Sequence, residues 1–445
     1  MTVGTAPAGA GAGSGAPEAG GHITAGLAVA GSGRARLLAG APGREDLHLH
    51  RGRSGRPAWD RPDRIFDSVQ AAGLRGRGGG YFPLAEKMDA ARRSPGPAVV
   101  VVNATESEPA SAKDRYLMLF RPHLILDGAQ AVAAAVNADR VVLAVHSGAP
   151  AQSLCRAVGE RDSDPVPCEV SFVPDRYVAG ESGALVSWID GGPALPTGRS
   201  RPSAISGVGG RPTVVSNAET VSHVALIVQA GPDWFRAVGP EAAPGSVLIT
   251  VTGDVASPGR VLEVVGPATV GEAVAAAGGS TGRPAAVLIG GYAGRWQPVD
   301  AVWDLPVDPV RLAEAGSPIG CGLFGVLAAD RCGLAEAARL AGWLATQRAG
   351  QCGTCDAGLP ALAEAAAGVA AGSLRGRKGL RRIADLGDAL AGRNLCHLPD
   401  GALSMVESAL TTFWDEMALH EKRRCSGRSD APLFPIPAGD PQRVV

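Results

Sequence analysis

The chain has 445 residues, a formal net charge of −1 and eight cysteines, and it is long enough for two to four domains with apolar cores. The near-neutral charge gives no electrostatic reason to expect nucleic acid or an anionic membrane as a partner. The sequence contains no run of about 18 apolar residues that could span a membrane. We expect no secretory signal, because the first residues lack a charged region followed by an apolar core. We therefore expect a cytoplasmic protein whose close cysteine pairs serve metal or redox chemistry.

Residues 1–60 begin rich in glycine and alanine and continue rich in arginine and histidine. Because little of this segment could be buried, we expect mostly a disordered tail. One short strand is expected within it, near residues 23–30.

Residues 61–240 alternate strand and helix patterns. β-branched runs at residues 99–102 and 140–145 lie on either side of helical apolar spacing over residues 122–137. This alternation predicts an α/β domain with a mainly parallel sheet. In such sheets, ligands bind beyond the carboxyl ends of the strands.

Residues 241–330 change to short strands with one helix, which predicts a small α+β domain of ββα type. The strands are expected at 246–252, 259–265, 287–290 and 325–328, with the helix at 269–277.

Residues 331–422 predict a helical domain, because apolar residues recur there with a spacing near 3.6. The helices are expected at 334–346, 359–371, 379–390 and 401–420. Residues 423–445 are polar and proline-rich, so we expect a disordered C-terminal tail.

The first segment that suggests a ligand-binding site is the glycine-rich loop GLRGRGGGYFPLAEK at residues 73–87. Glycine has no Cβ, so the backbone can approach a ligand closely and present N–H groups to a phosphate. Arg75, Arg77 and Lys87 would add positive charge, although such a run alone is more often a flexible loop. The acidic turn NATESEPASAKDR at residues 103–115 offers acceptors to a sugar or ring, and together the two segments favour a nucleotide-type cofactor.

Two later turns lead from a strand end into a helix: YVAGESGAL at residues 177–185 and GRPTVVSNAET at residues 210–220. Gly180 permits close approach of a ligand, and Glu181 either caps the helix or contacts a cofactor. Asn217 is either a helix N-cap or a hydrogen-bond partner for a ring edge.

Cys352 and Cys355 form a C-x₂-C pair, and Cys396 follows after two predicted helices. This spacing fits one iron–sulfur cluster or a zinc ion, with a redox-active dithiol as the alternative. A cluster needs about four ligands, so Asp356 or His397, each adjacent to a cysteine, could complete it. A three-iron cluster would need only the three thiolates.

In order and spacing, these motifs resemble the flavin-containing, NADH-oxidising subunit of respiratory complex I. Related subunits serve NAD-dependent hydrogenases and formate dehydrogenases. The resemblance covers roughly residues 73–418. It implies an α/β fold with a Rossmann-like FMN domain at 61–240, a ubiquitin-like β-grasp domain of the soluble-ligand-binding class at 241–330, and a helical iron–sulfur domain at 331–422.

The resemblance also implies cofactors and partners. FMN would be bound, NAD(H) would be the substrate, and the cluster would be [4Fe–4S] with a non-cysteine fourth ligand, or [3Fe–4S]. Electrons would pass to a small ferredoxin-like iron–sulfur protein or to a membrane redox subunit. The protein would then be cytoplasmic, either free or held at the inner face of the membrane through its partners.

The resemblance to this family implies a role for individual residues of the sequence. Glu108 corresponds to a carboxylate near the nicotinamide and Glu181 to an acid beside the isoalloxazine, so we assign both as catalytic. The residues that correspond to cofactor-binding positions are Gly73, Arg75, Gly76, Gly78, Phe82, Lys87, Asn103, Glu106, Gly180, Ser216 and Asn217. The corresponding metal ligands are Cys352, Cys355 and Cys396.

Several positions depart from the family pattern. The departures are Thr105 for an aspartate, Ser182 for a second glutamate, Ala90 and Pro202 for adenine-stacking aromatics, Arg199 for a lysine and Gly358 for the third cysteine. The FMN half of the site is therefore largely retained, whereas the NADH half is partly eroded and the cluster has lost one cysteine. Two alternatives follow: a flavoprotein that no longer uses NADH, and a non-catalytic assembly or binding subunit.

Overall fold

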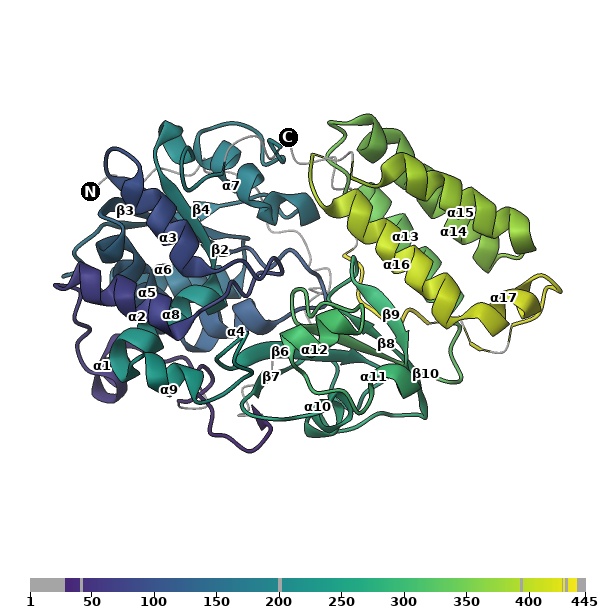
Figure 1. Cartoon of the computed structure of the whole chain (residues 1–445), viewed down its shortest axis with the longest axis horizontal. Helices are drawn as coiled ribbons and strands as arrows, with labels where there is room; N and C mark the ends of the chain where they lie inside the picture. The colour runs from purple at the N-terminus through teal and green to yellow at the C-terminus, as the bar shows by residue number, and fades with distance from the viewer. Residues whose placement is uncertain are drawn as a thin grey trace, which may run out of the picture.

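The computed structural model of the chain describes residues 29–40, 43–198, 202–392, 395–425, 427–428 and 431–437. Three parts lie side by side: an α/β domain, a small domain built on a mixed sheet, and a bundle of helices (Figure 1). Most of the expected strand near residues 23–30 lies outside the described residues, as does Arg199.

The α/β domain is built on a four-stranded parallel sheet of order β4-β3-β2-β5. The strands are β2 (Ala98–Ala104), β3 (Ala138–Val145), β4 (Cys168–Phe172) and β5 (Thr213–Asn217). The helices are α2 (Pro62–Ala72), α3 (Leu84–Arg93), α4 (Lys113–Phe120), α5 (Pro122–Ala135), α6 (Ala149–Gly159), α7 (Ser182–Ile189), α8 (Ala218–Ala230) and α9 (Pro232–Arg236). The chain runs from β2 outward to β4 and then returns to place β5 on the other side of β2. The strand order therefore reverses between β2 and β5, which is where ligands bind in such sheets.

The second domain has a six-stranded sheet of order β1-β7-β6-β10-β8-β9. Its strands are β1 (Val29–Ala30), β6 (Val247–Gly253), β7 (Arg260–Val264), β8 (Pro284–Ile289), β9 (Arg295–Pro298) and β10 (Leu323–Ala328). Its helices are α10 (Val270–Ala276), α11 (Val299–Val302) and α12 (Pro309–Glu314). The central strands β6 and β10 are parallel and each is flanked by an antiparallel neighbour, as expected for a β-grasp arrangement.

The third part consists of helices packed around a shared apolar core. They are α13 (Gly333–Thr346), α14 (Leu359–Ala370), α15 (Gly376–Leu390), α16 (Leu398–Thr412) and α17 (Trp414–His420), with a π-helical turn at Thr354–Gly358. The helix predicted over residues 401–420 is broken at Phe413, whose backbone leaves helical geometry (φ −108°, ψ 34°). Apolar spacing continues across the break, so the sequence pattern did not reveal it.

The prediction of a disordered tail over residues 1–60 is wrong for the described part of that segment. Helix α1 (Leu47–Ser54) forms there, and His50 is fully buried. Its Nε2 lies 2.7 Å from Asp127 Oδ2 on α5, while Glu45 accepts a hydrogen bond from Arg121 Nε at 3.0 Å. The charged residues that suggested solvation are instead paired with one another against the α/β domain.

The prediction of a disordered tail over residues 423–445 is also wrong in part. Phe434 is 1% exposed and belongs to the core of the helical domain. Glu336 on α13 accepts its N–H at 3.1 Å, and Tyr292 donates its hydroxyl to the Pro435 carbonyl at 2.6 Å. One buried aromatic ring and a set of hydrogen bonds, these two among them, therefore fix a segment whose composition is polar.

We expect the substitution Phe434→Ala to lower the free energy of unfolding by about 3–5 kcal/mol, the range for truncating a buried phenylalanine. Denaturant unfolding followed by circular dichroism measures the change. Phe172→Ala serves as the control because Phe172 is 51% exposed. Equal effects of the two substitutions would show that the C-terminal segment does not stabilise the domain.

Candidate functional site

A cavity of about 320 Å³ opens beyond the carboxyl ends of β2 and β5. All three parts of the chain contribute to its walls. The lining residues are Gly78, Gly79, Asn103, Thr105, Glu106, Ser107, Glu108, Ser111, Lys113, Asp114, Tyr177, Val178, Gly180, Glu181, Asn217, Gly290, Gly320, Cys321, Cys396, His397 and Leu398. The turns that the sequence singled out are thus brought to one place.

Two asparagines form one polar wall. The register of β2 and β5 sets Asn103 opposite Asn217. Asn103 donates its Nδ2 hydrogen to the Gly180 carbonyl at 2.8 Å, and Asn217 donates to Asp114 Oδ2 at 2.6 Å. Asn217 also caps α8 by accepting the Glu219 N–H, so the cap that the sequence suggested is present on a residue that also lines the cavity.

Glu106 shapes the acidic turn. Its backbone is left-handed (φ 44°), which is uncommon for a residue other than glycine. Its carboxylate accepts the N–H groups of Asp114 and Arg115 at 3.0 and 2.8 Å and the Ser111 hydroxyl at 2.6 Å. The carboxylate is therefore engaged at the start of α4, and the turn around it faces the cavity in a fixed shape.

Lys113 brings positive charge to the same wall. Its Nζ lies 2.9 Å from Asp114 Oδ1 and 3.0 Å from Glu219 Oε2, and all three residues are buried. Burial lowers the pKa of Lys113, but the neighbouring carboxylates outweigh burial and raise it above its usual value. Lys113 is therefore charged, and it is the one lysine or arginine among the described residues that line the cavity.

Glu108 and Cys321 meet on the β-grasp side of the cavity. A Cβ at Gly291 would lie 2.6 Å from Glu108 Oε2 and 2.9 Å from Cys321 Sγ, so this glycine makes room for both side chains. Glu108 Oε2 accepts the Tyr292 N–H at 2.9 Å, whereas Oε1 is buried with no hydrogen-bond partner in the described structure. Burial raises the pKa of Glu108 to about 8, and burial together with Glu108 raises the pKa of the Cys321 thiol.

Glu181 also performs a structural task. Its Oε2 accepts the N–H groups of Gly183 and Ala184 at 2.8 and 3.1 Å, so it caps α7 while lining the cavity. A Cβ at neighbouring Gly180 would lie 2.7 Å from the Ser107 hydroxyl oxygen. The glycine therefore lets the acidic turn approach this loop closely.

Part of the glycine-rich loop does not reach the cavity. The site residues that do not line it are Gly73, Arg75, Gly76, Phe82, Lys87, Ser216, Cys352 and Cys355. Arg75 Nε donates to the Ala242 carbonyl and Lys87 Nζ to the Val215 carbonyl. Gly78 does line the cavity, and a Cβ there would lie 3.2 Å from Asn217 Cβ. The loop thus contributes backbone, not charged side chains, to the cavity wall.

These features fit a flavin. The cavity is within the range of about 300–1,000 Å³ typical of small-molecule sites. Backbone of Gly78 and Gly180 and the amides of Asn103 and Asn217 line it, which suits a flat ring with polar edges. The unpaired Oε1 of Glu108 supplies a further group for a ligand to contact.

The three predicted metal ligands gather beside the cavity. Cys355 donates its N–H to the Cys352 carbonyl at 3.0 Å. Burial raises the pKa of Cys396, and the nearby Cys355 and Cys352 raise it further. Cys396 also lines the cavity. The cysteine group and the cavity therefore share a wall.

The position of the missing cysteine is filled. A Cβ at Gly358 would lie 2.3 Å from Cδ2 of Leu390 on α15, so a leucine side chain occupies the space a longer residue would need. Of the two candidate fourth ligands, Asp356 pairs with Arg348 at 3.4 Å on the surface, and His397 lines the cavity next to Cys396. Both remain adjacent to a cysteine.

Comparison with known proteins assigns the chain to a family. The NADH-quinone oxidoreductase F subunit of Mycobacterium bovis is 30% identical over 391 residues, which cover 81% of this chain and 85% of that protein. The corresponding F subunit of Streptomyces coelicolor is 29% identical over 382 residues, covering 81% and 83%. The chain belongs to the family of NADH-quinone oxidoreductase F subunits. The resemblance inferred from the motifs is confirmed.

Two family models match within the chain: the Nuo51 FMN-binding domain at residues 69–226 and the NADH-ubiquinone oxidoreductase-F iron–sulfur binding region at residues 335–420. Among solved structures, an air-oxidised NAD⁺-reducing [NiFe]-hydrogenase matches with a TM-score of 0.74 and 28% identity. That match covers 87% of this chain and 66% of the hydrogenase chain. The predicted fold class is confirmed. In the described parts of the chain, no helix has the length and apolarity needed to cross a membrane.

The sequence prediction missed Lys113, Tyr177 and Cys321 as lining residues. Lys113 lies within the acidic turn already singled out, and a lysine followed directly by an aspartate was the available sequence signal. Tyr177 is the first residue of the turn YVAGESGAL, which the sequence also singled out. Cys321 had no such signal, because its approach to Glu108 depends on packing between two domains.

The raised pKa of Glu108 predicts a pH-dependent stability. Between its usual pKa of 4.5 and the folded value of about 8, the folded state holds a proton that the unfolded state has lost. The free energy of unfolding should therefore fall by up to about 1.4 kcal/mol per pH unit as pH rises. Glu108→Gln removes this contribution, so its stability relative to the unsubstituted protein should increase from pH 5 to pH 8.

Thermal unfolding at pH 5, 6.5 and 8 measures this difference. Glu314→Gln is the matched control because Glu314 is exposed. A carboxylic-acid band in the infrared spectrum at pH 6.5 that disappears in Glu108→Gln would support the assignment. A constant stability difference across the three pH values would contradict it.

Proposed function

We propose that this chain is the flavoprotein subunit of an NADH-oxidising electron-transfer complex. The cavity would hold FMN and the helical domain an iron–sulfur cluster, and the two together would carry electrons away from NADH. The observation that carries this proposal is the position of Cys396, which belongs both to the cysteine group and to the cavity wall. Such sharing of a wall suits direct transfer between two redox centres.

Bound FMN would supply the chemistry, since a flavin accepts a hydride and passes electrons on singly. We assign Asn103, Asn217 and Gly180 to hold its ring, with Gly78 allowing close approach of the backbone. Lys113 would place positive charge beside the anionic cofactor. These assignments rest on the lining of the cavity.

The charge of Glu108 and of Glu181 would decide how well the cavity accepts an electron-rich ligand. A carboxyl with a pKa of about 8 is mainly protonated at neutral pH, so Glu108 presents a hydrogen-bond donor and no negative charge to incoming NADH. Glu181 is held by the amides at the start of α7, which offset its negative charge. Both carboxyls would therefore tolerate an electron-rich ligand nearby.

The route for NADH would follow the side of the cavity toward Phe82, which is 47% exposed and lies over Lys87, with 5.8 Å from Nζ to the ring centroid. Ser182, Ala90 and Pro202 replace residues that the family uses on this side. We therefore propose that NADH is still the substrate but that adenine stacking is weak. A flavoprotein reduced by another donor is the second candidate, favoured by those three replacements.

Our proposals for the redox partner and for the cellular location rest on membership of this family. We propose that the cluster delivers electrons to another redox subunit, either a ferredoxin-like iron–sulfur protein or a membrane redox subunit. The chain would then reach the inner face of the membrane through that subunit. The cluster would be [3Fe–4S], or [4Fe–4S] with Asp356 or His397 as fourth ligand.

Anaerobic mixing of the FMN-loaded protein with NADH should bleach the flavin absorbance near 450 nm. Asn217→Ser should weaken FMN binding by on the order of tenfold, because it keeps the helix cap but loses one hydrogen-bonding amide. Thr269→Ser is the matched control, since Thr269 caps α10 away from the cavity. Unchanged flavin absorbance with both NADH and NADPH would contradict NADH oxidation and favour the second candidate.

Cys396→Ser should lower bound iron and acid-labile sulfide while FMN stays bound and reducible by NADH. Loss of one of three clustered thiolates removes a ligand that iron requires. Iron and sulfide analysis with EPR of the reduced protein measures the effect and the cluster type. Cys155→Ser, which alters a cysteine on α6, should leave iron unchanged. Equal iron contents in both variants would remove Cys396 from the ligand set.

A further inference from the structure

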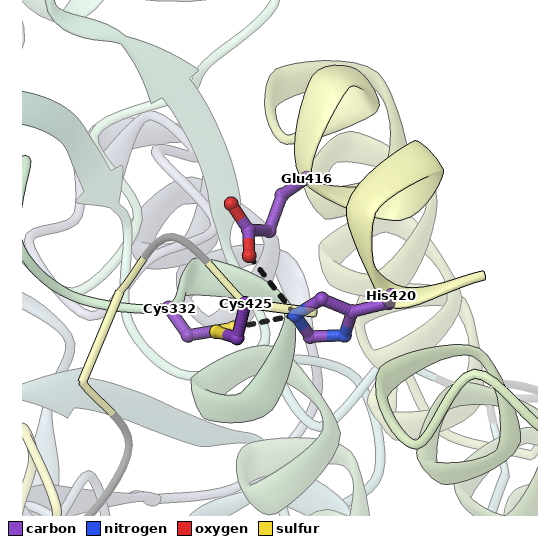
Figure 2. A group of neighbouring side chains, drawn as sticks. All are labelled: Cys332, Glu416, His420 and Cys425. Carbon is purple, nitrogen blue, oxygen red and sulfur yellow. Dashed lines mark hydrogen bonds and ion pairs between the residues drawn. The ribbon is translucent and has the colours of Figure 1, made fainter. Parts of the chain in front are cut away.

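A second group of side chains of types that can bind a metal lies between the start of α13, the helix α17 and the C-terminal segment (Figure 2). Cys332 stands at the start of α13, Glu416 and His420 lie one turn apart on α17, and Cys425 follows in the C-terminal segment. One donor atom from each lies within 4.8 Å of all the others. None of these four residues has a part in the flavin cavity or in the group of Cys352, Cys355 and Cys396.

His420 is oriented as a metal ligand would be. Its Nδ1 lies 2.5 Å from the carbonyl oxygen of Ala370, so Nδ1 must carry the hydrogen of that bond. In the neutral ring, Nε2 then has a free electron pair, and it faces Cys332 Sγ at 3.4 Å and Glu416 Oε1 at 3.0 Å. Histidines that bind metals commonly donate the other ring N–H to a carbonyl in this way.

The donor types and their spacing favour one zinc ion. Zinc binds thiolate, imidazole and carboxylate ligands, usually four in a tetrahedron. Bond lengths of about 2.0–2.3 Å place the ligands of such a tetrahedron about 3.5 Å apart. The distances of 3.4 and 3.0 Å from His420 Nε2 are close to this spacing.

The C-terminal segment is held in position for Cys425 by its main chain. Arg428 donates its N–H to the Asp330 carbonyl at 2.7 Å, and Cys332 donates its N–H to the Arg428 carbonyl at 3.1 Å. A Cβ at Gly427 would lie 2.3 Å from the backbone carbon of Arg331, so only glycine allows the segment to lie this close. The two cysteines are therefore brought together by contacts that do not involve a metal.

We propose that Cys332, Glu416, His420 and Cys425 bind one zinc ion at a structural site separate from the iron–sulfur cysteines. Binding replaces the two thiol hydrogens, which leave as protons, and involves no electron transfer. The ion would fasten the C-terminal segment and α17 to the start of α13. Three of the four ligands are buried or half-buried. This suits a structural site and not a catalytic one.

Two metal-free arrangements are the alternatives. In one, a protonated His420 donates to Glu416 as an ordinary ion pair, with the thiols beside it. In the other, Cys332 and Cys425 form a disulfide. Either would account for part of the geometry, so the experiment must distinguish them from zinc.

The test is metal analysis by mass spectrometry on the full chain, purified without air and loaded with FMN and its cluster. We expect about one zinc per chain in addition to iron. Cys425→Ser and Cys332→Ser should each lower zinc at least fivefold; the second keeps a side chain able to cap α13. Cys155→Ser should retain zinc. Cys352→Ser should lose iron but retain zinc, which separates the two metal sites.

A chelator titration gives a second readout. Removing zinc should lower the melting temperature of the unsubstituted protein but leave that of Cys425→Ser unchanged. Absorption bands from cobalt bound by thiolates should appear after exchange of zinc for Co²⁺ and be absent in Cys425→Ser. Zinc absent from the purified protein and not taken up from Zn²⁺ solution would overturn the proposal. So would equal zinc in Cys425→Ser, iron in place of zinc, or a Cys332–Cys425 disulfide found in peptides of the anaerobic protein.

Discussion

The pairing of β2 with β5 is the constraint on which the site depends. Asn103 is the next-to-last residue of β2 and Asn217 is the last residue of β5, and the parallel register sets them side by side. Because β5 runs parallel to β2, the turns that follow the two strands open at the same edge of the sheet. The hydrogen bond from Asn217 to Asp114 then ties the two turns together. A slip of one residue in this register would move Asn103 away from Asn217.

Three helices begin at the cavity, and the side chains that cap or brace their first turns are also site residues. Glu106 accepts amides of α4, Glu181 accepts amides of α7, and Asn217 accepts an amide of α8. The positive ends of the helices offset the negative charge of the two glutamates. An anionic cofactor can therefore lie beside these acids without strong repulsion. Local stability of the helices and the electrostatics of the site thus depend on the same three side chains.

The sequence was informative wherever a pattern is local. Strand and helix periods predicted most elements closely, and turns between strand and helix predicted Asn103, Gly180 and Asn217 at the cavity. It was less informative where the outcome depends on partners distant in the chain. Arg75 lies in the glycine-rich loop and Lys87 in α3, but backbone carbonyls bind both charged side chains away from the cavity. The predictions of two disordered tails were wrong for the same reason. Composition does not show which charged residues will pair or which aromatic ring will be buried.

The cavity is lined by residues from Gly78 near the start of the chain to Leu398 near its end. Its walls exist together only when the α/β, β-grasp and helical parts have docked. The helical part is synthesised last, and until it docks the cavity lacks the wall formed by Cys396, His397 and Leu398. Full enclosure of a ligand in this cavity therefore requires that the whole chain has been synthesised and that its three parts have docked.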